Sequence, residues 1–183
     1  IISLAATDIP GVIEHDRNPK SERRTQLQLI DISRAYFNAK IKQVETPTFV
    51  QLPAEDPDAE SMCAQLLRHV YGTRSAADGW QEEYSTLLGS VGFRQGDACP
   101  NVFHDRERGI VTSVHGDDFT FRGLHEDLLK VQGWMKEWFE IKVRGILGPR
   151  HDYQKEIVIL GKKVKWLSEG IEYEADGEHR EEL

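Results

Sequence analysis

Two adjacent carboxylates, Asp117 and Asp118, lie between two apolar stretches of the chain. Residues 110–114 and 119–121 both alternate with the two-residue period of strands. Gly116 can adopt the positive φ that a tight hairpin turn requires. The pattern predicts a β-hairpin with two acids at its tip. Because neighbouring carboxylates repel, at least one tends to hold its proton unless a cation is present, so the pair fits either a solvated acidic turn or a metal site.

A third carboxylate, Asp31, ends another segment with strand periodicity. In residues 27–32, Leu27 and Leu29 share a face with Asp31. Three carboxylates at one end of a sheet would make a hard, oxygen-rich site suited to Mg²⁺ or Mn²⁺. Two such ions, roughly 3.5–4 Å apart, can support in-line phosphoryl transfer.

The elements that would position these acids follow from apolar spacing. Ser75–Val91 and His125–Phe139 have apolar residues at helical spacing, and Gly92 is well placed to end the first helix. Further strands are expected at residues 141–143, 157–160, 163–166 and 171–173, with a peripheral β-pair at 48–52 and 62–66.

The order strand, long helix, strand-turn-strand, helix, strand predicts an α+β fold with a ferredoxin-like βαββαβ sheet. In that plan the first strand lies beside one arm of the hairpin, which would bring Asp31 next to Asp117 and Asp118. We expect the main domain at residues 27–175, preceded by an apolar helix end over 1–10 and a polar stretch over 11–26. Residues 176–183 would begin a connection to a following region.

Composition limits the possible functions. Cys63 and Cys99 are widely spaced among 183 residues, so neither a disulfide framework nor a zinc pattern is expected. The apolar start Ile1–Ala6 is too short for a signal peptide, and no run is long enough to span a bilayer. We expect an intracellular segment of a longer protein. Its net charge of −8 implies that basic surface for nucleic acid must come from elsewhere.

Several motifs, in order, resemble the reverse transcriptases of copia-type LTR retrotransposons. The segments that carry the resemblance are Leu29–Ala39 (similar to LDVKTAFLNG), Val70–Trp80 (YGLKQAPRAW), Phe93–Val102 (GF…SDPCVY), Val114–Phe119 (the YVDD box), Phe139–Lys142 (FEMKD) and Ile159–Val164 (FLGIEI). The resemblance covers about residues 26–175. It implies a polymerase palm with partial fingers in residues 1–26 and a truncated thumb.

The resemblance also implies chemical roles. Asp31 and Asp117 would be the principal ligands of two Mg²⁺ or Mn²⁺ ions, Asp118 the second acid of the box, and the backbone carbonyl of Ile32 a further ligand. The activity would be RNA-directed DNA synthesis on a primer 3′-hydroxyl. The partners would be an RNA or DNA template-primer, deoxynucleotides, and the remaining fingers, thumb and RNase H regions of a parent polyprotein, in a cytoplasmic particle or the nucleus.

Five other positions take roles from the resemblance. Tyr36 stands at the aromatic position that excludes a 2′-hydroxyl, or is a core aromatic residue. Arg74 replaces a Lys and would face template or triphosphate, or solvate a loop. Ser75 replaces a Gln of the nucleotide-binding segment. His115 and Gly116 replace Tyr and Val of the box on the primer side, which implies a more flexible turn.

Two other functions compete with an active polymerase. A non-catalytic remnant or co-opted structural module would keep the fold and the acids, and a palm-fold nucleotidyl cyclase would use acids at the same positions. The ordered motifs speak against the cyclase. The three acids and Tyr36 favour activity, whereas the negative charge, Ser75 and the missing basic fingers motifs favour a relic.

Overall fold

The computed structural model describes residues 25–42, 46–168 and 170–174. The chain divides into two compact units, one joining Ile1–Ser33 to Leu88–Leu183 and the other comprising Arg34–Leu87. The helix end expected over residues 1–10, nearly all of the polar stretch 11–26, and residues 176–183 lie outside the described residues.

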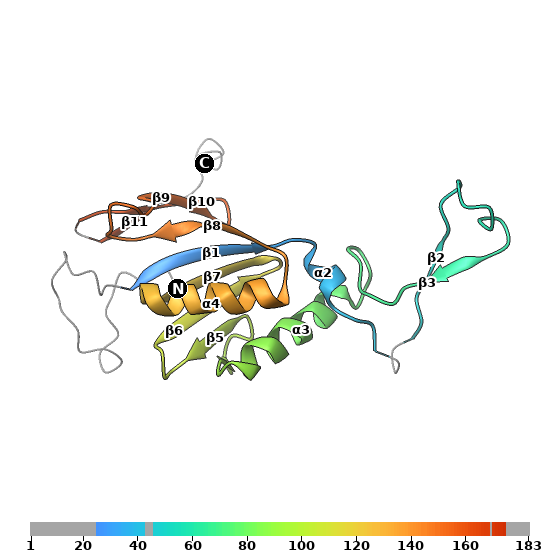
Figure 1. Cartoon of the computed structure of the whole chain (residues 1–183), viewed down its shortest axis with the longest axis horizontal. Coiled ribbons are helices and arrows are strands. Elements are labelled where there is room, and N and C mark those ends of the chain that lie inside the picture. The colour runs from blue at the N-terminus through green and yellow to red at the C-terminus, as the bar shows by residue number, and fades with distance from the viewer. Residues whose placement is uncertain (1–24, 43–45, 169, 175–183) are drawn as a thin grey trace, which may run out of the picture. The chain divides into compact units, whose positions relative to one another are not determined.

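The first unit contains a six-stranded sheet with the order β4-β5-β6-β7-β1-β8, in which all neighbours are antiparallel (Figure 1). Its strands are β1 (Gln26–Ile32), β4 (Arg94–Gln95), β5 (Val102–Asp105), β6 (Ile110–His115), β7 (Asp118–Gly123) and β8 (Ile141–Leu147). As the sequence predicts, β1 lies beside the hairpin arm β7. Together with the helices, this sheet makes the chain a mixed α+β protein.

Helix α4 (His125–Trp138) lies against β1 and β7 on one face of this sheet (Figure 1). Its buried residues are Leu128, Val131 and Met135, whose spacing places them on one side of the helix. The side-chain amide of Gln28 in β1 donates a 2.9 Å hydrogen bond to that of Gln132 in α4. The helix predicted at His125–Phe139 is therefore confirmed.

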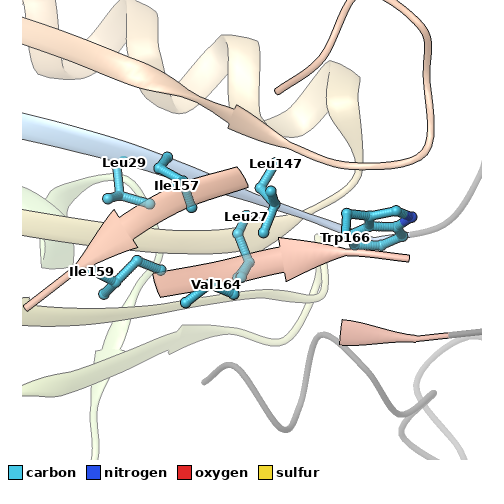
Figure 2. Close-up of a cluster of buried hydrophobic side chains, with 7 residues drawn as sticks. All are labelled: Leu27, Leu29, Leu147, Ile157, Ile159, Val164 and Trp166. Atoms are coloured by element: carbon cyan, nitrogen blue, oxygen red, sulfur yellow. The ribbon is translucent and has the colours of Figure 1, made fainter. Parts of the chain in front are cut away.

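A three-stranded antiparallel sheet, in the order β11-β10-β9, lies against the other face. Its strands are β9 (Glu156–Ile159), β10 (Lys162–Trp166) and β11 (Ile171–Glu174). The buried cluster between the two sheets, drawn in Figure 2, contains Leu27, Leu29, Leu147, Ile157, Ile159, Val164 and Trp166. Leu27 and Leu29 alternate with Gln28 along β1, so this strand contacts the small sheet on one face and α4 on the other.

The second unit contains α2 (Ala35–Asn38), the antiparallel pair β2 (Phe49–Gln51) and β3 (Cys63–Gln65), and most of α3 (Ala76–Ser90). The peripheral β-pair is thus confirmed. Helix α3 begins and ends within one residue of the bounds predicted at Ser75 and Val91. Tyr84 is buried in α3, and this burial, followed by the charge of Tyr36, raises its pKa to about 12.

Candidate functional site

The Asp-Asp turn is the tip of a hairpin formed by β6 and β7. His115 pairs with Asp118, which leaves Gly116 and Asp117 as a two-residue turn. Gly116 has a φ of 62°, the positive value that both common turns of this length require at their first position. The predicted hairpin is therefore confirmed, and His115 and Gly116 are exposed at its tip.

Asp31 lies directly opposite Asp118 in the antiparallel pairing of β1 with β7. The backbone amide of Ile32 donates a 2.9 Å hydrogen bond to the carbonyl of Asp117. This hydrogen bond fixes the turn against the end of β1. The side chains of Asp31 and Asp118 both retain partial exposure to solvent.

A β-bulge in β8 adds a fourth charged residue to the carboxylates. Leu29 of β1 pairs with Gly145, whereas the next residue, Ile30, pairs with Val143, so Arg144 is the extra residue in the bulge. A Cβ on Gly145 would lie 2.0 Å from the side chain of Gln154, and its φ is 146°, so only glycine fits there. The strand expected at residues 141–143 was too short, since the bulge lets β8 continue to Leu147.

The guanidinium of Arg144 contacts two of the three acids. Its Nη2 donates a hydrogen bond to Asp31 Oδ2 and lies 3.7 Å from Asp118 Oδ1. The hydrogen bond that Arg144 donates to Asp31, followed by the attraction of Asp118, Asp31 and Asp117, raises the pKa of Arg144. All three carboxylates therefore act on the same guanidinium.

The pKa of Asp118 is raised above its ordinary value. Burial is the largest cause, and the charges of Asp117 and Asp31 raise it further, whereas Arg144 and His115 lower it. Repulsion among the acids, predicted from their types alone, is thus present at Asp118. As the side chains lie, no three His, Cys, Asp or Glu residues in the described ranges form a group able to hold a metal ion.

A pocket of about 150 Å³ opens beside Asp118 and Arg144. Its lining includes Leu29 of β1, together with Leu160 and Gly161 in the turn between β9 and β10. Leu160 has a φ of 50° and Gly161 one of 74°, as expected for a tight two-residue turn. No pattern in the sequence predicts that this turn lies beside the acids.

The other residues named from the resemblance belong to the second unit, Arg34–Leu87. The ring of Tyr36 packs edge to face against Tyr71, with centroids 4.4 Å apart. The hydroxyl of Ser75 lies 3.4 Å from Nδ1 of the buried His69. Arg74 is exposed.

A scan against models of known protein families finds no match to this chain, and a search of curated proteins finds none either. Among the described residues, no helix is long and apolar enough to cross a membrane.

Proposed function

We propose that this chain is the palm of an RNA-directed DNA polymerase similar to those of copia-type retrotransposons. The observation that carries the proposal is the placement of Asp31 opposite Asp118, with Asp117 in the adjoining turn. The strand order β6-β7-β1-β8, with α4 between β7 and β8 in the chain, supports the proposal of a ferredoxin-like sheet. A polymerase palm uses carboxylates at this end of such a sheet.

The acids suit a hard divalent cation. The guanidinium of Arg144 already contacts Asp31 in β1 and Asp118 in β7. Carboxylates from two strands therefore bind one positive charge together, which supports a cation site here. Asp31, Asp117 and Asp118, with the carbonyl of Ile32, would hold Mg²⁺ or Mn²⁺. When bound, two such ions would favour deprotonation of a primer 3′-hydroxyl and neutralise charge on the leaving pyrophosphate.

The remaining residues would act on the substrates. We assign Tyr36 to exclusion of the 2′-hydroxyl, Arg74 and Ser75 to the nucleotide or template, and His115 and Gly116 to the primer end. The net charge of −8 disfavours phosphate contacts, so the template-primer would be held with the help of basic fingers, thumb and RNase H regions of a parent polyprotein. We propose an intracellular location for that assembly.

A second candidate function is a non-catalytic module that keeps the same fold. The observation that favours it is the ion pairing of Arg144, whose positive charge offsets part of the repulsion between Asp31 and Asp118. The two functions differ in a simple respect. A polymerase incorporates deoxynucleotides in a metal-dependent reaction that Asp31→Asn abolishes, whereas a module incorporates none.

A further inference from the structure

Arg144 reaches the carboxylates because of the backbone bulge that carries it. The side-chain amide of Gln154 donates a 3.3 Å hydrogen bond to the carbonyl of Arg144, and its backbone amide donates a 3.0 Å bond to that of Ile146. Gly145 leaves room for the Gln154 side chain. The bulge backbone is therefore held on both sides of Gly145, at the carbonyls of Arg144 and Ile146. A bulge next to a site commonly redirects one side chain toward it.

The side chain of Arg144, in contrast, is held in the described part of the chain only by its hydrogen bond and ion pairs with the carboxylates. It remains 49% exposed, so the ion pairs lie at the surface, where solvent makes such pairs weak enough to open readily. The oxygens it contacts, Asp31 Oδ2 and Asp118 Oδ1, belong to the two acids that face each other across β1 and β7. A guanidinium and a divalent cation cannot use the same oxygens together, and their charges repel.

We propose that Arg144 is a resident counter-ion that competes with divalent metal for Asp31 and Asp118, so that metal binds only when the guanidinium withdraws. The inference rests on the proposed function, because it takes these acids to be metal ligands. Its consequence is a metal affinity set by the fraction of molecules in which the ion pairs are open. Arg144 thus acts as a positioning residue, which keeps the carboxylates together while no metal is bound.

The test is a Mn²⁺ titration of the 183-residue chain, followed by the loss of the free-ion electron paramagnetic resonance signal. Arg144→Leu removes the competing charge and is expected to tighten Mn²⁺ binding roughly 3- to 10-fold. Arg144→Lys keeps a positive charge and is expected to stay close to the wild type. Arg150→Leu is the matched control, because Arg150 pairs with Asp152 instead and its loss makes the same change in net charge.

Two results would overturn the inference, and they are distinguishable. If Arg144→Leu binds Mn²⁺ no more tightly than Arg150→Leu, while Asp31→Asn loses binding, the acids are metal ligands but Arg144 does not compete. If neither the wild type nor Arg144→Leu binds Mn²⁺ while circular dichroism shows both folded, the proposed metal site fails as well. Tighter binding in Arg144→Leu that Asp31→Asn reverses in the double variant supports the inference.

Discussion

Asp31 and Asp118 are cross-strand partners, and one guanidinium lies against both of them. Paired carboxylates directly opposite each other destabilise a sheet unless a cation offsets their repulsion. In this chain the positive charge comes from Arg144, which is the extra residue in the bulge of β8. Stability at this end of the sheet and the proposed metal binding would therefore be coupled.

The raised pKa of Asp118 predicts a pH-dependent stability. The native state binds the carboxyl proton of Asp118 more tightly than the unfolded state does. The wild type therefore loses stability as the pH rises from 3.8, the ordinary pKa of an aspartate, through the raised native pKa. Asp118→Asn removes that loss. The free energy of unfolding of the variant, minus that of the wild type, should increase over this range in urea titrations at several pH values.

Asp152→Asn provides a control of opposite sign. A hydrogen bond from Arg150 lowers the pKa of Asp152, so this carboxylate adds stability that is present above pH 3.8 and is lost as the pH falls through its lower native value. The free energy of unfolding of Asp152→Asn, minus that of the wild type, should therefore decrease as the pH rises toward 3.8. A flat profile for Asp118→Asn would show that the burial of Asp118 has no effect on its titration.

Gly116 is expected to resist substitution for a backbone reason alone. Nothing lies within 4 Å of a Cβ built at this position, but its φ is 62°. Gly116→Ala should lower the free energy of unfolding by about 1–2 kcal/mol. Gly133→Ala, in the exposed middle of α4 with the same open space, should raise it by about 1 kcal/mol. Equal effects in chemical denaturation would contradict the observed turn.

The packing of the small sheet on β1 and β8 can be tested by comparing a valine-to-alanine substitution at a buried site with the same substitution at an exposed site. Val164 is fully buried in the cluster of Figure 2, whereas Val158 is 55% exposed. Val164→Ala should cost about 2 kcal/mol of stability, because it removes buried methyl groups and leaves a cavity. Val158→Ala should cost about 0.5 kcal/mol or less. Similar losses at both sites would mean that the cluster is not a packed core.

Tyr36 is proposed to exclude nucleotides that carry a 2′-hydroxyl on the sugar. Tyr36→Ala should reduce the preference for deoxynucleotides over ribonucleotides by roughly tenfold to a hundredfold in single-nucleotide incorporation. Tyr71→Ala is the control, because it removes the ring that packs on Tyr36 but leaves Tyr36 itself. Unchanged sugar discrimination in Tyr36→Ala would remove this residue from the proposed role.

Periodicity was sufficient to predict the parts of the fold that bury one face. The alternation of Leu27 and Leu29 with Gln28 correctly separated the two faces of β1, since one faces the small sheet and the other faces α4. Helical spacing placed both long helices within one residue of their bounds. The order of these elements was enough to predict Asp31 beside the hairpin.

The ion pairing at the site could not be predicted in this way. A bulge adds one residue that has no partner across the strands, so a two-residue period cannot reveal that Arg144 reaches Asp31. The adjacent Gly145 was the available signal, because an isolated glycine in a strand often marks a bulge. The place of Leu160 in the pocket lining depends on how the small sheet packs on the large one, which no local pattern encodes.

The most direct test of the central claim is primer extension on an RNA template with Mg²⁺ or Mn²⁺, using the chain together with the proposed fingers, thumb and RNase H regions of its parent polyprotein, and comparing the wild type with Asp117→Asn. Asn keeps the size of the side chain and leaves the backbone carbonyl that accepts from Ile32. The account predicts metal-dependent incorporation of deoxynucleotides by the wild type and its loss in the folded variant. Equal incorporation by both, or none by a folded wild type, would contradict it.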